Sequence, residues 1–285
     1  MNRSAKEINL QFLSLTVLFI ILIFFLPIVK KSQKLEQTQG NITSKFSTPT
    51  PFNPFPYVLP KIPYARSYLT LLVGDSIVGS LGPNADTLRQ NLIDLYPDHE
   101  FVNYNYGFGS TNITSLPERL TGNTSYRGQE FPAILSQAVD LIIIESFAYN
   151  PLSEKPENEN VSKHIQILDE SVKKIIQTRP KTAVALMTPI APNTIFFAKG
   201  VYDLSGEERA LWAKERIMYI EAVVEYANKN NIPLINVYEK SLTPTGDGDL
   251  KYINPDDYIH PSHNGVILMS KTIADFIFTN NIFPQ

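Results

Sequence analysis

The chain has 285 residues, of which 43% are hydrophobic and 19% are charged, and its formal net charge is −3. This length supplies one sizeable core, and the charge provides no basic surface, so no nucleic-acid partner is expected. Cysteine is absent, which excludes disulfides, thiolate zinc sites and a cysteine nucleophile. Because the four histidines are scattered along the chain, we expect no metal and no cofactor.

The first 31 residues contain a long apolar segment. No residue from Leu10 to Val29 is charged, and a helix of this length matches a hydrocarbon layer of about 30 Å. The sequence therefore predicts a transmembrane anchor over residues 1–31. A cleaved signal peptide is the alternative, although its apolar region is usually shorter and followed by small residues. Lysines and an arginine flank the segment on both sides and leave the orientation open.

Residues 32–67 differ in composition from the segments on either side. They are rich in Gln, Thr, Ser and Pro, and the run from Thr48 to Pro56 contains a proline at every second or third position. Proline disfavours helices and sheet ladders, so we predict an extended spacer whose aromatic residues can lie on a folded domain over residues 68–285.

That domain alternates short apolar runs with segments of helical periodicity. Strands are expected at residues 68–73, 101–105, 140–145, 182–187 and 233–237, and helices at 87–96, 132–137, 161–177, 207–229 and 262–278. The pattern predicts an α/β fold, a three-layer α/β/α sandwich around a mainly parallel five-stranded sheet. In the fourth helix, Trp212, Ile217 and Ile220 recur at helical spacing, which indicates a face packed on the core.

Polar residues follow several of these strands. Ser76 lies directly after the first strand, Gly107 and Gly109 follow the second, and Asn150 follows the third. The carboxyl ends of parallel strands meet at one rim. There the Ser76 amide, a glycine amide and the Asn150 side chain could donate to the oxyanion of an acyl-transfer intermediate. The alternative is that these glycines and Asn150 only form turns.

Near the end of the chain, Asp257 and His260 lie three residues apart in a polar stretch. Together with Ser76 they supply the nucleophile, base and orienting carboxylate of a serine hydrolase. Asp256 and His263 are the rival carboxylate and base, and Asp75 is expected to bind backbone groups near the serine.

The chain from about residue 68 to 280 resembles the SGNH/GDSL hydrolase family. Gly74-Asp75-Ser76-Ile77 is similar to its first block, and Gly107 falls at the glycine of the second. Asn150 matches the third block, but Pro151 replaces the usual Asp. The final block is Asp257-x-x-His260-Pro261, and its spacing favours this pair over the two rivals. The resemblance implies a flavodoxin-like SGNH fold and a site made of Ser76, Asp257, His260, Gly107 and Asn150.

The same residues argue against an α/β-hydrolase. The nucleophile elbow of that fold requires Gly-x-Ser-x-Gly, and Val78 occupies the second glycine position. Ser76 is therefore expected on a looser turn at a helix start, in a shallow site.

These inferences predict a membrane-anchored serine ester hydrolase whose catalytic domain lies outside the cytoplasm. Its expected substrates are O-acetylated envelope carbohydrates or lipid esters. An O-acetyltransferase with the same triad and a catalytically silent envelope glycan-binding protein are the alternatives. The sequence gives no indication of oligomeric state.

Overall fold

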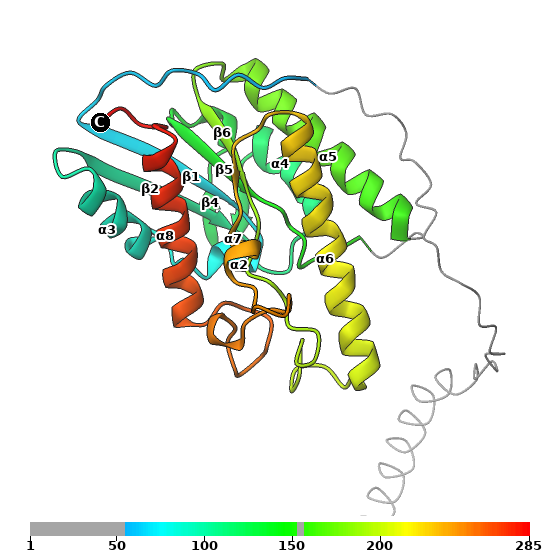
Figure 1. Cartoon of the computed structure of the whole chain (residues 1–285). Coiled ribbons are helices and arrows are strands. Elements are labelled where there is room, and N and C mark those ends of the chain that lie inside the picture. The colour runs from blue at the N-terminus through cyan, green and yellow to red at the C-terminus, as the bar shows by residue number, and fades with distance from the viewer. Residues whose placement is uncertain (1–54, 153–156) are drawn as a thin grey trace, which may run out of the picture. The chain divides into compact units, whose positions relative to one another are not determined.

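A computed structural model describes residues 55–152 and 157–285 (Figure 1). The chain divides between Thr48 and Pro49, and every described residue belongs to the second unit, Pro49–Gln285. The predicted anchor over residues 1–31 and most of the spacer lie outside the described residues. Within the described part, no helix has both the length and the apolar character needed to cross a membrane.

A parallel sheet of five strands forms the centre of the domain (Figure 1). Its strands are β1 (Ser67–Gly74), β2 (Glu100–Gly107), β5 (Leu141–Glu145), β6 (Ala183–Met187) and β7 (Leu234–Ile235). Their order is β2-β1-β5-β6-β7, and every neighbouring pair is parallel. The five predicted strands and their parallel arrangement are confirmed, and the order is that of a flavodoxin-like sheet.

Helices cover both faces of this sheet. The α-helices are α2 (Ser76–Gly79), α3 (Asp86–Leu95), α4 (Leu116–Thr121), α5 (Glu157–Thr178), α6 (Gly206–Lys229), α7 (Val237–Lys240) and α8 (His263–Thr279). Buried side chains of α3 and α8 pack in one core cluster, and those of α4 and α5 pack in the other. Figure 1 shows α3 and α8 side by side on one face of the sheet and α5 on the other. The three-layer prediction is therefore confirmed.

Strand burial follows position in the sheet. Every residue of β5 and β6 is buried, as expected for strands covered on both faces. In contrast, β2 is an edge strand with alternating burial, and Val102 and Tyr104 are exposed. Helices α6 and α8 begin at side-chain caps, the reciprocal Ser205 and Glu208 capping box in α6 and the Ser262 side chain in α8.

The helix predicted over residues 132–137 is wrong. This segment contains only a single 3-10 turn, Ile134–Ser136, because six residues are too few to nucleate an α-helix without strong tertiary support. The sequence also gave no indication of α4 or of the antiparallel hairpin formed by β3 (Thr124–Tyr126) and β4 (Gln129–Phe131).

The last part of the predicted spacer belongs to the folded domain. Tyr57 is buried, and its hydroxyl accepts a hydrogen bond from the Val184 N–H at 2.8 Å. Strand β7 is only two residues long and pairs with β6 from Leu186 onward, so it leaves Val184 without a strand partner on that side. Tyr57 satisfies this N–H and covers the open edge.

Candidate active site

The sheet register brings the ends of three strands together. Gly74 at the end of β1 pairs with Gly107 at the end of β2, and Val73 pairs with Ile144 of β5. The loops that follow these strands therefore share one rim. Ser76 begins α2 immediately after β1, and the Asp75 carboxylate caps this helix by accepting from the Ile77 N–H at 2.8 Å. As the first residue of a helix, Ser76 has an N–H with no intrahelical acceptor.

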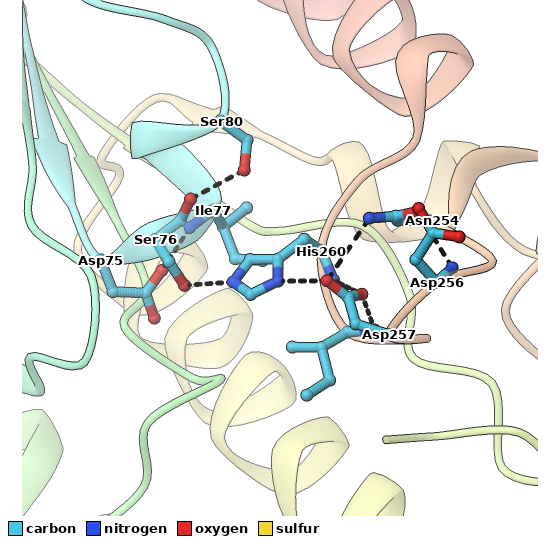
Figure 2. Close-up of polar contacts among 9 residues, drawn as sticks. Asp75, Ser76, Ile77, Ser80, Asn254, Asp256, Asp257 and His260 are labelled. Carbon is cyan, nitrogen blue, oxygen red and sulfur yellow. Dashed lines mark hydrogen bonds and ion pairs between the residues drawn. The ribbon is translucent and has the colours of Figure 1, made fainter. Parts of the chain in front are cut away.

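Ser76, His260 and Asp257 form a continuous hydrogen-bonded series (Figure 2). The Ser76 Oγ lies 2.9 Å from His260 Nε2, and His260 Nδ1 lies 2.8 Å from Asp257 Oδ2. Because a carboxylate only accepts, Nδ1 must carry the proton that it donates to Asp257. The Nε2 lone pair of the neutral ring then faces the serine hydroxyl. The structure brings together the three residues that the sequence selected.

A tight loop holds Asp257 against the histidine. Asp257 Oδ1 accepts from the N–H groups of Ile259 and His260, at 2.8 and 3.0 Å. Partial burial pushes the pKa of Asp257 up, but these donors and the His260 ring outweigh it and leave the pKa below its ordinary value. The intervening Tyr258 has a φ of 54°, a left-handed conformation that a non-glycine residue adopts at a cost of about 1–3 kcal/mol.

The rival residues lie apart from the serine. The Asp256 N–H donates to Asn254 Oδ1, and Figure 2 shows the Asp256 side chain turned away from the imidazole. His263 is an exposed residue in the first turn of α8. The pairing of Asp257 with His260 is thus the arrangement that the loop geometry permits.

Gly107 lies against the nucleophile helix at very short range. A Cβ at this position would lie 2.2 Å from the Gly79 nitrogen and 2.7 Å from the Val78 carbonyl carbon. The Gly107 N–H donates to Asn105 Oδ1 at 2.8 Å, and Asn105 Nδ2 donates in turn to the Val78 carbonyl at 2.9 Å. The Gly107 amide predicted as an oxyanion donor is therefore engaged by Asn105, and the glycine permits close packing of β2 on α2.

Gly109 lies close to the serine side chain. A Cβ added to it would lie 3.5 Å from the Ser76 Cβ. Its N–H donates to the Tyr126 hydroxyl at 2.8 Å, and the Tyr126 ring stacks on Phe108 with centroids 4.7 Å apart. The sequence predicts Gly109 at the rim but gives no sign of Tyr126, because the β3–β4 hairpin that carries this residue has no strong sequence pattern.

Asn150 is oriented by a buried carboxylate. Its Nδ2 donates to Asp75 Oδ2 at 2.7 Å, and Asp75 is completely buried. An amide nitrogen has two protons, so one remains available after this bond. Asp75 thus binds a backbone N–H near the serine, as expected from the sequence, and also binds the Asn150 side-chain amide.

Two carboxyl groups and one guanidinium are buried below Ser76. Burial raises the pKa of Asp75, although donation by Ile77 and Asn150 opposes the shift. Burial and the neighbouring Asp75 raise the pKa of Glu145 well above its ordinary value.

Arg119 donates to the Gly74 carbonyl at 2.8 Å and the Tyr106 carbonyl at 3.1 Å. Burial lowers the pKa of Arg119 to about 10. Arg119 therefore remains a cation and ties the ends of β1 and β2 together.

A cleft of about 580 Å³ opens beside these groups, with Asn150 and Ser110 on its wall. Its other lining residues are Asn112, Tyr149, Pro151, Tyr202, Trp212, Glu215 and Arg216. A second hollow, of about 430 Å³, lies along α6 and α7, and its lining residues include no member of the candidate site or of this cleft. Across residues 55–152 and 157–285, no cluster of three or more His, Asp or Glu side chains is arranged to hold a metal ion.

Comparison with known proteins shows similarity in structure but not in sequence. No family model matches the chain, and no curated protein is a sequence match. A lipolytic protein of the G-D-S-L family from Desulfitobacterium hafniense is 15% identical, with a TM-score of 0.50 over 73% of this chain and 98% of that one. A variant of an acetyl-xylooligosaccharide esterase from Geobacillus is 17% identical, with a TM-score of 0.51 over 74% and 94%.

The chain has the SGNH/GDSL hydrolase fold. A gut microbial diltiazem-metabolizing enzyme shares it with a TM-score of 0.53 at 15% identity; the match covers 76% of this chain and 48%, about half, of that longer chain. At these identities the comparison concerns the SGNH fold itself, and the roles of individual residues have to be argued from their contacts.

Proposed function

We propose that this protein is a serine ester hydrolase that works through an acyl-enzyme on Ser76. The observation that carries the proposal is the series from Ser76 Oγ to His260 Nε2 at 2.9 Å and from His260 Nδ1 to Asp257 Oδ2 at 2.8 Å. Neutral His260 takes the hydroxyl proton as Ser76 Oγ attacks the ester carbonyl. Asp257, whose pKa is lowered, then stabilises the imidazolium.

The oxyanion of the tetrahedral intermediate needs nearby donors. We assign this role to the Ser76 N–H, the free proton of Asn150 Nδ2 and the Gly109 N–H. Gly109 replaces Gly107 in this assignment because a Cβ on Gly109 would lie 3.5 Å from the Ser76 Cβ, whereas the Gly107 amide donates to Asn105, which is itself bonded to the Val78 carbonyl. The Gly109 amide donates to the Tyr126 hydroxyl in the free protein, so substrate must displace this contact.

In the next steps, His260 returns its proton to the leaving alcohol and then activates water against the acyl-enzyme. About 37% of the His260 side chain is exposed, which lets water reach the ring and supports hydrolysis over acyl transfer to a bound acceptor. The structural neighbours named for lipolytic and acetyl-xylooligosaccharide esterase activity support an ester substrate. We further propose that the protein is membrane-anchored through residues 10–29, with the catalytic domain outside the cytoplasm.

Labelling with a fluorophosphonate tests the nucleophile, because only an activated serine reacts with this probe. The full-length protein should be labelled and should hydrolyse 4-nitrophenyl acetate, and Ser76→Ala should lose both properties while keeping its thermal unfolding midpoint. Labelling that survives in Ser76→Ala would refute the assignment. Ser80→Ala, which alters the hydroxyl bonded to the Ser76 carbonyl at 2.9 Å, is the matched control and should still be labelled.

Anchoring is tested separately on the full chain. Because the apolar segment from Leu10 to Val29 matches a bilayer, the protein should remain in the membrane fraction after extraction with salt and with carbonate. Release by carbonate would refute the anchor and would leave the esterase proposal unaffected.

A further inference from the structure

The cleft beside the candidate site adjoins the proposed oxyanion donors. Asn150 forms part of its wall, and Ser110, the residue after Gly109, forms another part. An ester whose carbonyl oxygen lies against Asn150 must extend one of its two groups away from Ser76. Asn150 lines this cleft, so the side chains of the cleft indicate the chemistry of the ester group that extends into it.

The wall of the cleft does not suit a fatty acyl chain. Among the described residues that line it, none is Leu, Ile, Val or Met, whereas sites for apolar ligands are lined mainly by hydrophobic side chains. Exposed Val201 and Leu211 lie next to lining residues in the sequence without contributing to the wall.

The cleft also does not suit an anion. The charged side chains among its described lining residues are Glu215 and Arg216, which form an ion pair at 2.5 Å. Arg216 Nη1 additionally donates to the Trp212 carbonyl at 3.1 Å. A phosphate or carboxylate would therefore have to compete with Glu215 for the guanidinium.

Two aromatic rings form one side of the cleft. Tyr202 exposes 51% of its surface, and its ring centroid lies 5.4 Å from that of Trp212. The Arg216 guanidinium packs on the Trp212 ring at 5.1 Å from its centroid, which fixes the ring without adding flexible atoms to the cleft. Exposed aromatic faces of this kind offer a rigid apolar surface with a polar edge.

Hydrogen-bonding groups lie around these rings. The Ser110 hydroxyl and the Asn112 Nδ2 supply donors, because Asn112 uses only its Oδ1 to cap the following turn. The Glu215 carboxylate and the Tyr202 hydroxyl supply acceptors. The cleft therefore combines aromatic rings with several uncharged polar groups and one ion pair. This combination matches a sugar ring, which has apolar C–H faces and many hydroxyl groups.

We infer that the cleft is a subsite for a neutral carbohydrate, which is the alcohol part of the ester, with Tyr202 and Trp212 as its aromatic platform. The inference rests on the proposed esterase function for its link to Ser76, but binding of the sugar can be measured without turnover. The acyl group then lies outside the cleft.

Trp212 is the single tryptophan of the chain, so its fluorescence reports directly on the cleft. The full-length Ser76→Ala protein in detergent is titrated with acetylated xylo-oligosaccharide and with dihexanoyl phosphatidylcholine. We expect a saturable change in emission with the oligosaccharide and none with the lipid. A saturable change with the lipid alone, or with neither probe, would overturn the subsite.

Kinetics separate this inference from the esterase proposal. Tyr202→Ala in the active protein should raise KM for acetylated xylo-oligosaccharide by roughly tenfold, the upper range for one aromatic contact. Its kcat/KM for methyl acetate, whose alcohol part is a single methyl group and does not extend into the cleft, should stay within about twofold. Tyr64→Ala is the matched control, because Tyr64 is 66% exposed and does not line the cleft.

The outcomes are distinguishable. Equal losses on both substrates in Tyr202→Ala would overturn the subsite and leave the esterase intact. A protein that binds the oligosaccharide through Trp212 but is inactive on every ester would retain the subsite and overturn the proposed hydrolysis, which is the result expected of a catalytically silent glycan-binding protein.

Discussion

Gly107→Ala is the substitution for which the structure permits the most direct estimate. The added Cβ would lie 2.2 Å from the Gly79 nitrogen, and real Cβ atoms essentially never approach a heavy atom within 3.0 Å. The end of β2 and the helix α2 must therefore separate by about 0.8 Å, the difference between these two distances. The obstacle is backbone, so no side-chain rotation can relieve it.

This displacement moves the nucleophile, because α2 is only four residues long and begins at Ser76. A misplacement of about 1 Å costs roughly a hundredfold in rate, so kcat/KM for 4-nitrophenyl acetate should fall by about ten- to a hundredfold. Overpacking of this kind costs about 1–3 kcal/mol, which lowers the thermal midpoint of a domain of this size by about 2–12 °C.

The measurement pairs esterase kinetics with thermal unfolding of the full-length protein. Gly206→Ala is the control, because a Cβ there meets nothing within 4 Å, and it should change neither quantity appreciably. A Gly107→Ala protein with at least a third of the normal activity and an unchanged midpoint would refute the packing argument.

Three further predictions concern the donors and the base. Asn150→Ala should lower kcat by about a hundred- to a thousandfold, the usual cost of removing one oxyanion donor, and a loss below about threefold would make Asn150 a turn residue only. Tyr126→Phe should raise kcat/KM on a small ester by about two- to fivefold, because it frees the Gly109 N–H from a hydrogen bond at 2.8 Å; a decrease would show that the hydroxyl itself serves the reaction. On acidification, kcat/KM should fall, because a histidine that acts as a base must be neutral, and a flat profile over about pH 5–8 would contradict a histidine base. The lowered pKa of Asp257 keeps its carboxylate ionised over this range, so the loss does not come from Asp257.

The sequence predicted the sheet well because parallel strands buried on both faces are continuous apolar runs. The fully buried strands β5 and β6 were placed within one residue at their starts. The hairpin β3–β4 has three residues in each strand, most of them exposed or half-buried, and such short polar strands have no distinctive periodicity. Their position depends on tertiary contacts, such as the stacking of Tyr126 on Phe108.

The candidate site was predictable to a similar degree. Ser76, Asp257 and His260 could be selected because a strand end and a three-residue spacing fix their chemistry locally. The family resemblance selected Gly107 over Gly109, although both follow the same strand. Only the three-dimensional contacts show that the Gly107 N–H donates to Asn105 and that Gly109 adjoins the Ser76 side chain. Trp212 was predicted as a core residue from helical spacing, and the structure shows it partly buried against the core and also lining the cleft.

The Gly-Asp-Ser sequence before α2 has a physical reason at each position. Gly74 is required because a Cβ there would lie 2.4 Å from Val78 Cγ2 and 2.9 Å from the Glu145 Cβ. Asp75 caps the helix that presents Ser76 and holds Asn150 at 2.7 Å, and one buried carboxylate therefore positions both the proposed nucleophile and a proposed oxyanion donor. Burying that charge is costly without compensation. The structure supplies compensation through the Ile77 N–H, the Asn150 amide and the nearby Arg119 cation. Asparagine at position 75 would retain an acceptor for only one of the two donors, so its amide nitrogen would face either Ile77 or Asn150. The acid is therefore needed at this position for its two acceptor oxygens and not for proton transfer.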